Sequence, residues 1–404
     1  MTRNVCFYVY GYPPDYSGAT IQALKLAGVL EQKGCRCVFV SYTYKQEFLN
    51  ASGDNRFKLI RFLRPQKGLF LYHVRLLKSL FKAKGSFDTL YINGNEGQFW
   101  TPVYIALFCK IFSKKVFMEL NMEYADPLSI SGTTLDWLKR MRVASIDGYI
   151  SLSSAIHGGM QANYPEAKST LLYNGVDTNV FRPASCSENK TEIRKKLGLP
   201  LSGKVVVTCG GVSKRKGIDF LIDVWQSVVG CEDEPQLHIL GPLERIEGFT
   251  SDFTTKVLAQ AESSKMKGSV VFQGMVDNVH EYFMAADLFI FAGRQEGSPN
   301  VLREAMAAGL PIVSLELEGI TTDMIESGVD GVIVNVPDQA ALRNYLHTVI
   351  DDPNIKNDFV KNVIDLLTHD DLAAEMGRKA REKALSHFTL ERQAKKLIDL
   401  MDKL

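Results

Sequence analysis

Short apolar runs alternate with amphipathic, helix-like stretches along most of the chain. In the first part of the sequence, the strand-like runs lie at residues 5–10, 36–42, 59–62, 89–92, 116–119 and 148–151. Helical stretches such as 19–32, which Gly34 ends, separate these runs. Strands that alternate with helices in this way predict a parallel, doubly wound sheet.

A second series of the same kind begins after residue 200. The polar stretch 184–190 is expected to be a surface loop, and 191–197 a short helix. The strand-like runs that follow lie at 205–208, 236–240, 270–272, 288–291, 312–315 and 332–334. Because 404 residues exceed one ordinary core, the sequence predicts two similar α/β domains.

The run 287–292 is apolar without alternation, as a strand buried on both faces requires. The residues after it predict a loop and then a helix of roughly ten residues, because Ser298 suits the N-cap and Pro299 the first helical position. Gly309 is expected to end this helix.

Polar groups surround the start of that helix. Backbone N–H groups near Gly297, Asn300 and Val301 lie at the positive end of the helix dipole, where a phosphate binds readily. Glu296 precedes the helix, and Glu304 shares a flank with Asn300. Two carboxylates around an anion site suit a sugar linked to a nucleoside diphosphate. The alternative is an ordinary βαβ unit in which both carboxylates are only solvated.

A basic loop follows the strand-like run 205–208. Residues 209–217 read CGGVSKRKG, so glycines and three consecutive cations stand at a strand end. A lysine there supplies charge to a diphosphate, and the glycines let the backbone approach it. The alternative is a solvated basic turn.

The Glu-x7-Glu spacing within EGSPNVLREAMAAGLP resembles the donor-site motif of retaining glycosyltransferase family four. The resemblance implies two Rossmann-like domains facing a cleft, the GT-B architecture. It also implies metal-independent transfer of a sugar from a UDP- or GDP-sugar to a hydroxyl acceptor, with retention. In that reading Glu296 binds sugar hydroxyls, Glu304 binds the ribose, and Lys216 holds the phosphates.

Two positions depart from the family pattern. The family has Gly-Arg before Lys-Gly in the basic loop; Lys216 and the glycine after it match, but Gly211 stands at the arginine position. Either Lys214 or Arg215 supplies the second charge, or Lys216 acts alone. In the first domain the family often has a histidine after the strand at 116–119, where this chain has Asn121.

The resemblance assigns three catalytic residues and a larger set that binds the donor. The catalytic residues are Glu296, Lys216 and Asn121, and Glu119 or Glu123 is a possible acceptor-side base. The donor-binding residues are Gly18, Gly211, Arg215, Lys216, Met275, Glu296, Gly297, Ser298, Asn300, Val301 and Glu304.

The loop that contains Gly18 lacks Gly-x-Gly-x-x-Gly, which disfavours a dinucleotide site; a plain turn is its alternative reading. No metal is expected, since no metal-ligand spacing is present. No cofactor and no nucleic acid partner are expected either.

The resemblance divides the chain into an acceptor-side domain at 1–172, a nucleotide-sugar domain at 173–388 and a last helix at 389–404 that returns to the first domain. A nucleotide-sugar epimerase or hydrolase of the same fold, or a non-catalytic sugar-nucleotide-binding subunit, remains open. Seven cysteines without a Cys-x-x-Cys pair, and no leader-like apolar run, predict a cytoplasmic protein.

Between residues 56 and 84 the chain has nine cations and no acidic residue. These cations are Arg56, Lys58, Arg61, Arg64, Lys67, Arg75, Lys78, Lys82 and Lys84. The stretch 69–84 reads as an amphipathic helix that suits the inner face of an anionic membrane, which would keep a glycan or lipid-linked acceptor near the enzyme. A helix packed on its own sheet, with a solvated basic face, has the same pattern.

Overall fold

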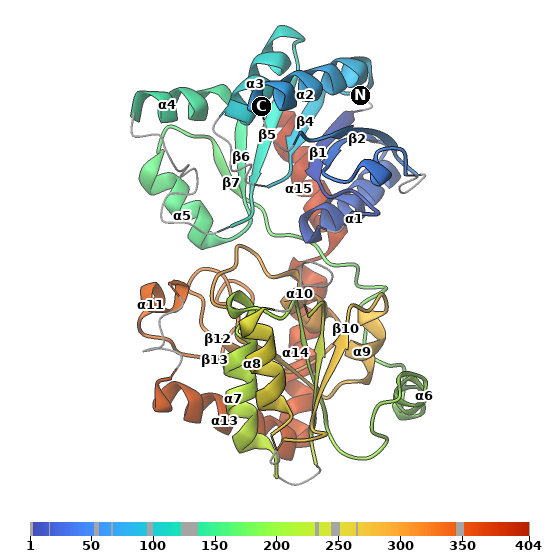
Figure 1. Cartoon of the computed structure of the whole chain (residues 1–404), viewed down its shortest axis with the longest axis vertical. Helices are drawn as coiled ribbons and strands as arrows, with labels where there is room; N and C mark the ends of the chain where they lie inside the picture. The colour runs from blue at the N-terminus through green and yellow to red at the C-terminus, as the bar shows by residue number, and fades with distance from the viewer. Residues whose placement is uncertain are drawn as a thin grey trace. The chain divides into compact units, whose positions relative to one another are not determined.

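The computed structural model describes residues 3–15, 17–51, 56–65, 68–94, 100–122, 136–230, 234–243, 251–263, 266–344 and 351–403. These residues form two compact units (Figure 1). The first unit joins Met1–Gly175 to Leu390–Leu404, and the second is Val176–Thr389.

The first unit contains a seven-stranded sheet in the order β3-β2-β1-β4-β5-β6-β7, with every pair of neighbours parallel. Its strands are β1 (Asn4–Tyr10), β2 (Arg36–Thr43), β3 (Lys58–Leu63), β4 (Thr89–Ile92), β5 (Lys115–Leu120), β6 (Gly148–Ser151) and β7 (Ser169–Leu171). Its helices are α1 (Gly18–Gln32), α2 (Leu69–Ala83), α3 (Trp100–Ile111), α4 (Asp136–Ser145), α5 (Ser154–Asn163) and α15 (Leu390–Lys403), with short 3₁₀ turns at Gln46–Phe48 and Lys84–Ser86.

Helices cover both faces of this sheet, which is why its strands are apolar throughout. On one face α2, α3, α4 and α5 pack against a core that includes Leu76, Ile105 and Met160. On the other face α1 and α15 pack against a core that includes Leu24 and Leu397.

The last helix is anchored to the first unit by polar contacts as well. The buried side chain of Gln393 accepts a hydrogen bond from the Gly175 backbone N–H (2.8 Å) and donates one to Asn174 Oδ1 (3.0 Å). Gln22 of α1 donates to the Gly175 carbonyl at 2.6 Å. Helix α15 is therefore fixed to α1 and to residues 174–175. Gly175 and Gln393, which bond to one another, are 218 positions apart in the sequence.

The second unit contains a six-stranded parallel sheet in the order β10-β9-β8-β11-β12-β13. Its strands are β8 (Val205–Cys209), β9 (Gln236–Leu240), β10 (Val270–Gly274), β11 (Leu288–Phe291), β12 (Ile312–Leu315) and β13 (Val332–Val334). Its helices are α6 (Ser187–Leu197), α7 (Ile218–Val228), α8 (Asp252–Ala261), α9 (Val279–Ala285), α10 (Asn300–Ala307), α11 (Gln339–Arg343), α13 (Pro353–Thr368) and α14 (Asp370–His387), with the 3₁₀ turn η3 at Lys214–Lys216.

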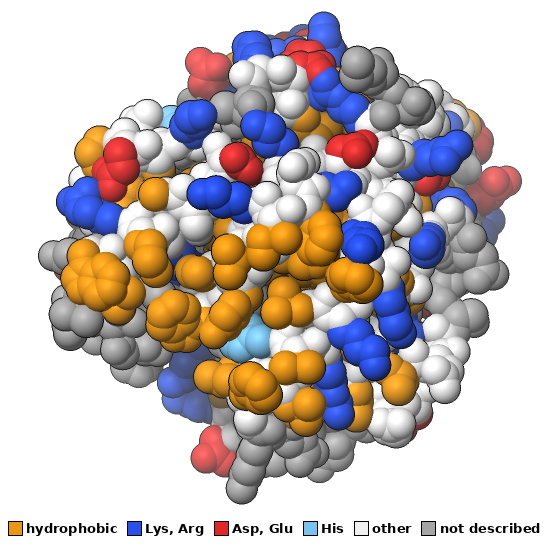
Figure 2. Space-filling model, turned by 90° about the horizontal axis from the view of Figure 1, so that it is seen from above, with side chains coloured by type: hydrophobic (Ala, Val, Ile, Leu, Met, Phe, Trp, Pro, Cys, Tyr) orange, Lys and Arg blue, Asp and Glu red, His pale blue; other side chains and the backbone are white. Residues whose placement is uncertain are grey.

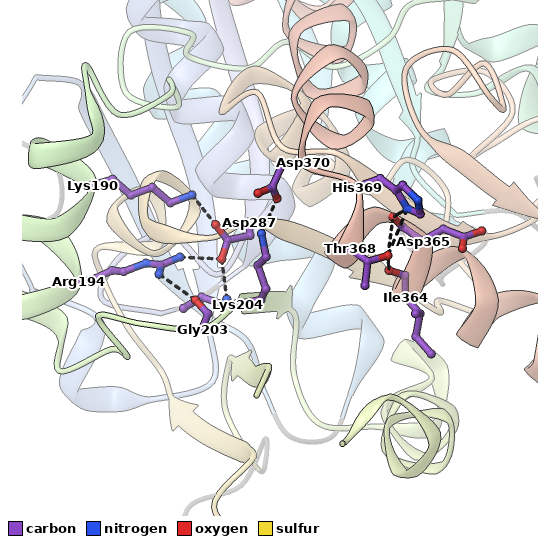
Figure 3. Close-up of polar contacts among 11 residues, drawn as sticks. Lys190, Arg194, Gly203, Lys204, Asp287, Ile364, Asp365, Thr368, His369 and Asp370 are labelled. Atoms are coloured by element: carbon purple, nitrogen blue, oxygen red, sulfur yellow. Dashed lines mark hydrogen bonds and ion pairs between the residues drawn. The ribbon is translucent and has the colours of Figure 1, made fainter. Parts of the chain in front are cut away.

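A polar cluster fixes the amino ends of the central strands β8 and β11 (Figure 3). Asp287 accepts from Lys190 Nζ (2.6 Å), from Arg194 Nη2 (2.6 Å) and from the Val205 N–H (2.7 Å). Burial favours the protonated acid, but the two cations of α6 outweigh it and lower the pKa of Asp287. The cluster joins α6 to the sheet at the end opposite to the candidate site.

Helix α6 and strand β7 differ from the sequence-based expectation. The stretch 184–190 was predicted to be a loop, but α6 already begins at Ser187. Its exposed surface is polar almost all round, so no apolar periodicity marks its first turn. Strand β7, three residues long and only half-buried, was not predicted because Ser169 and Thr170 give it little apolar character.

Candidate functional site

Each sheet has a topological switch point, where the strand order reverses direction. In the second sheet it lies between β8 and β11, which are neighbours although β9 and β10 intervene in sequence. Chains that leave the carboxyl ends of such strands diverge to opposite faces and leave a crevice where ligands bind in open α/β sheets. The two loops that the sequence singled out, 209–217 and 292–299, follow β8 and β11.

The β8 loop lies directly against the end of β11. Gly217 has a left-handed backbone (φ 66°), and a Cβ placed on it would lie 1.9 Å from the Ala292 carbonyl oxygen. The Arg294 N–H donates to the Arg215 carbonyl at 2.9 Å. Only glycine permits this close approach, which places the two loops side by side.

Glycines also line the carboxyl ends of the strands on the other side of β8. A Cβ on Gly241, which follows β9, would lie 2.4 Å from the Gly210 carbonyl oxygen. The Gly210 N–H in turn donates to Leu240, and the Gly241 N–H to Gly274 at the end of β10. These contacts leave a thin, side-chain-free backbone layer beside the Lys216 side chain, which runs over Gly210.

Glu296 is the centre of charge at the switch point. Its buried carboxylate lies 2.6 Å from Lys216 Nζ and 2.8 Å from Arg215 Nη1. Both cations face the same oxygen, Oε1, as ion pairs rather than as aligned hydrogen bonds. Lys214 is exposed. Of the two candidates for the second charge, Arg215 is therefore the one beside Lys216 and Glu296.

Two buried arginines brace the loop after β11. Arg294 donates to Asp219 of α7 at 2.6 Å. Arg303 of α10 reaches back to the loop, where its Nη2 donates to Ser298 Oγ (2.8 Å) and to Asn300 Oδ1 (2.9 Å). The loop that carries Glu296 is thus held by two guanidinium groups, one from a residue before Glu296 and one from a residue after it.

Ser298 does not have the predicted capping role. Helix α10 runs over Asn300–Ala307, with Pro299 at the N-cap and no side-chain cap hydrogen bond. The hydroxyl of Ser298 is engaged by Arg303 instead, and the helix begins one residue later than a Ser298 cap implies. Gly297 is buried just before this start, while Asn300 and Val301 are partly exposed at it.

Glu304 is near enough to the end of β8 to act on Cys209 electrostatically. Burial raises the pKa of the Cys209 thiol to about 12, and the negative charge of Glu304 adds to this rise while Lys216 opposes it. Cys209, Glu304 and Lys216 are therefore neighbours at the carboxyl end of β8. Met275, which follows β10, is exposed, and a Cβ on Gly211 would meet only Pro242, at 3.7 Å.

The first unit contains a second polar group at the carboxyl ends of β4 and β5. Buried Glu119 accepts from the Tyr91 hydroxyl (2.6 Å) and from Asn93 Nδ2 (3.1 Å). Asn121 covers Gly94, where a Cβ would lie 2.5 Å from its Nδ2. These residues lie beside the switch point of the first sheet, between β1 and β4. Glu123 lies outside the described residues.

Gly18 begins α1, after the N-cap Ser17, whose side chain accepts from the Thr20 N–H. It is exposed, and no atom lies within 4 Å of where its Cβ would be. Neither packing nor backbone conformation requires glycine here, so the space beside it is open within the first unit.

Sequence reasoning missed the two bracing arginines. Arg294 and Arg303 were not assigned, because arginine is normally exposed and a buried one leaves no trace in an apolar pattern. The available signal was Arg303 itself, a cation between Leu302 and Ala305 on the sheet-facing side of a short helix. Among the described residues, no group of three or more His, Cys, Asp or Glu side chains converges as a metal site.

Comparison with known proteins finds a family model that matches most of the second unit. Residues 189–383 match the model of the glycosyl transferases group 1 family, and these residues include β8, β11 and every candidate residue of the second sheet. Over these residues the chain is similar to the glycosyl transferases group 1 family. The residue-based resemblance to this kind of glycosyltransferase is thus confirmed.

Individual relatives match the chain over part of their length. The lipopolysaccharide core biosynthesis mannosyltransferase LpsB of Rhizobium meliloti is 28% identical over 48% of the chain and 54% of its own length. Mannosylfructose-phosphate synthase of Agrobacterium fabrum is 27% identical over 57% of the chain and 47% of its own length. The chain thus spans about half the length of these relatives.

The likeness to solved structures extends over the whole chain. HepE of Anabaena, in complex with UDP and glucose, superposes with a TM-score of 0.71 and 18% identity, covering 100% of both chains. At this identity the likeness shows the fold alone. It confirms the predicted GT-B class of two Rossmann-like sheets. None of the described helices is long and apolar enough to cross a membrane.

Proposed function

We propose that the protein is a retaining, metal-independent glycosyltransferase that moves a sugar from a UDP- or GDP-sugar to a hydroxyl acceptor. The observation that carries this proposal is the meeting of Lys216, Arg215 and Glu296 at the switch point of the second sheet. The match of residues 189–383 to the group 1 family model supports it. The donor is the substrate, and no cofactor is required.

The two cations suit the leaving group. When the bond between the anomeric carbon and the phosphate oxygen breaks, its electron pair leaves with the nucleoside diphosphate, and the sugar becomes positive at the anomeric carbon. Lys216, Arg215 and the N–H groups near Gly297–Val301 would stabilise that negative charge more in the transition state than in the ground state. These fixed positive charges take the place that a divalent cation has in other transferases.

The ion pairs of Glu296 with Lys216 and Arg215 suggest what this carboxylate does before and after the donor binds. One buried carboxylate balances two cations, so the cluster keeps a net positive charge and is held ready for an anion. When a diphosphate replaces Glu296 as the partner of Lys216, the carboxylate becomes available to sugar hydroxyls. Glu304, beside the end of β8, would then accept from the ribose hydroxyls.

The acceptor side of the proposal rests on the polar residues of the first unit. We place it on the first unit, near Asn121 and the open side of Gly18, with Glu119 as the carboxylate closest to the strand ends. The acceptor hydroxyl would enter on the face that the phosphate leaves, which gives retention. A carbohydrate or lipid-linked acceptor fits the names of the relatives, of which LpsB acts in lipopolysaccharide core biosynthesis. A cytoplasmic location at the inner face of the membrane is part of this proposal.

The donor nucleotide is the first quantity to measure. UDP is present in the HepE complex, so we expect UDP to raise the melting temperature more than GDP does. With the preferred sugar nucleotide, release of nucleoside diphosphate should require an acceptor. Release without any acceptor would favour a hydrolase, interconversion of the sugar an epimerase, and binding without turnover a non-catalytic subunit. Inversion at the anomeric carbon, or loss of activity with a chelator, would contradict the mechanism.

A further inference from the structure

Helices α2 and α3 of the first unit have apolar side chains on two faces. Their inner faces are explained by the sheet, against which Tyr72, Leu76, Ile105 and Phe108 are buried. Covering a sheet needs only one apolar stripe, and the opposite side of such a helix is ordinarily polar. The outer sides of α2 and α3 do not follow that rule.

The outer side of α3 repeats the spacing of a core-facing stripe. The exposed residues Trp100, Tyr104, Leu107 and Ile111 stand at i, i+4, i+7 and i+11, so they share one side of the helix. Leu107 is 55% exposed and Ile111 66%.

Helix α2 has the same feature. Phe70, Val74 and Phe81 are spaced i, i+4 and i+11 and share its outer side, with Phe70 82% exposed. Leu69 and Leu71 add exposed apolar surface at the start of the helix. A helix placed only to pack on its sheet, which was the alternative reading of 69–84, does not account for these side chains.

The two outer stripes belong to one surface. Helices α2 and α3 pack beside one another, and α4, with exposed Trp137 and Met141, packs next to α3. Figure 2 shows apolar side chains gathered in a broad patch on this side of the first unit, with Lys and Arg side chains at its border. We call the outer sides of α2 and α3 the α2–α3 face. Contiguous apolar patches of this kind mark interaction sites.

The charges of the α2–α3 face are all of one sign. Neither helix contains an acidic residue, and Lys78, Lys82 and Lys110 are exposed on them. Lys78 and Lys82 flank the Phe70–Val74–Phe81 stripe, where their long stems can lie along apolar surface while the ammonium groups reach outward.

Not every cation of the segment 56–84 contributes to this face. Arg75 donates to the Leu63 carbonyl at 2.7 Å, and Arg64 donates to the Tyr42 hydroxyl at 2.8 Å. Arg61 donates to the carbonyls of Ala51 and Tyr12. These three arginines fix loops and strands of the first unit. Fewer cations of 56–84 therefore face outward than the sequence suggested. The exposed positive charge also includes Lys110 on α3.

We infer that the α2–α3 face lies on an anionic lipid bilayer, with its aromatic and aliphatic side chains in the headgroup region and its lysines on lipid phosphates. Exposed Trp, Phe and Leu beside Lys are the composition of interfacial membrane helices. A second copy of the chain is disfavoured, because a two-fold contact would bring Lys78 and Lys82 close to their own copies. Protein interfaces are also depleted in lysine at their centres.

The intact protein can report this contact with its own fluorescence. Of its three tryptophans, Trp100 and Trp137 are exposed on α3 and α4, whereas Trp225 is wholly buried in the second unit. Vesicles of phosphatidylcholine with phosphatidylglycerol should shift the emission to shorter wavelength and sediment the protein. Phosphatidylcholine alone should do neither, and added salt should weaken binding. With Trp137→Phe the shift should persist, because Trp100 remains.

Two paired variants separate charge from apolar contact. The double variant Lys78→Glu/Lys82→Glu should lower partitioning more than tenfold, since each cation near an anionic surface contributes about fivefold. Its matched control is Lys395→Glu/Lys396→Glu, the same charge change on exposed residues of α15, across the sheet. Phe70→Ser/Leu107→Ser should abolish the emission shift, whereas Leu201→Ser, an exposed leucine of the second unit, should not. Unchanged melting temperatures would show that all four variants are folded.

The inference is independent of the donor chemistry, because the vesicle experiments contain no nucleotide sugar. Absence of sedimentation with anionic vesicles at low salt overturns it. Equal losses in the α2–α3 variants and their controls also overturn it. A dimer that Phe70→Ser dissociates, without any vesicle binding, would assign the face to a second copy instead.

Discussion

Glu119 should make the stability of the protein depend on pH in an unusual direction. The carboxyl group is buried between Tyr91 and Asn93. Burial raises its pKa from 4.5 to about 7, even though the hydrogen bonds from Tyr91 and Asn93 lower it. Near neutral pH the folded protein thus holds a proton on Glu119 that the unfolded chain has lost.

The size and sign of the effect follow from this difference in pKa. The pKa values of about 7 and 4.5 differ by about 2.5, which at about 1.36 kcal/mol per unit is about 3 kcal/mol. Below the unfolded pKa both states are protonated and Glu119 has no effect. Between the two pKa values the folded state binds more protons, so the free energy of unfolding falls as pH rises. Above about pH 7 the full cost remains constant.

The assay compares wild type with Glu119→Gln by denaturant unfolding from about pH 5 to about pH 8. Glutamine keeps the shape without the charge, so the variant should gain about 2.5 kcal/mol relative to wild type over that range. The comparison cancels other titrating groups, such as buried His238, whose pKa burial lowers to about 4. Glu391→Gln, on an exposed residue of α15, is the control and should show no such gain. A difference between Glu119→Gln and wild type that is the same at both ends of the range would refute the reasoning.

Four further predictions concern the second unit. Gly217→Ala should destabilise it by about 1–3 kcal/mol, because the new Cβ would overlap the Ala292 carbonyl; a melting temperature equal to wild type would show that the loops move apart freely. Gly211→Arg, at a position with room for a Cβ, should tighten UDP binding by adding a second phosphate charge, and weaker binding in calorimetry would show that the guanidinium cannot reach. Glu304→Ala should weaken UDP binding by roughly 1.5–3 kcal/mol, and an unchanged calorimetric affinity would remove the ribose contact. Lys216→Ala should nearly abolish transfer in the product-release assay while a chelator leaves wild type unaffected, and the reverse pattern would point to a metal.

The fold was accessible from sequence because burial on both faces leaves a simple signature. Runs such as 89–92, 148–151 and 312–315 coincide with β4, β6 and β12, since parallel strands under helices must be apolar throughout. The signature fails where an element is not buried. Strand β7 is half-buried, and it was missed. Helix α6 is polar on most of its surface, and its start was predicted too late in the sequence.

The candidate site was accessible in part. The sequence singled out Lys216 and Glu296 in separate loops, and the structure places their charged groups 2.6 Å apart because β8 and β11 are neighbours. Local rules gave the wrong role to Ser298, since capping preferences describe a helix in isolation. In the folded chain Arg303, five residues later, takes the hydroxyl. Long-range pairing of this kind has no local pattern from which to predict it.

The return of α15 to the first unit has a consequence for biosynthesis. The first and last residues of the second unit lie side by side. The Val176 N–H donates to the Phe388 carbonyl at 2.7 Å, and Val176 pairs with Thr389. On the ribosome, residues 176–389 can fold as soon as they emerge, whereas one face of the first sheet is covered only in part, by α1, until Leu390–Lys403 has been synthesised. The N-terminal unit, made first, is therefore completed last, and nascent chains that stop short of residue 390 should depend on chaperones to protect the exposed α1 side of that sheet.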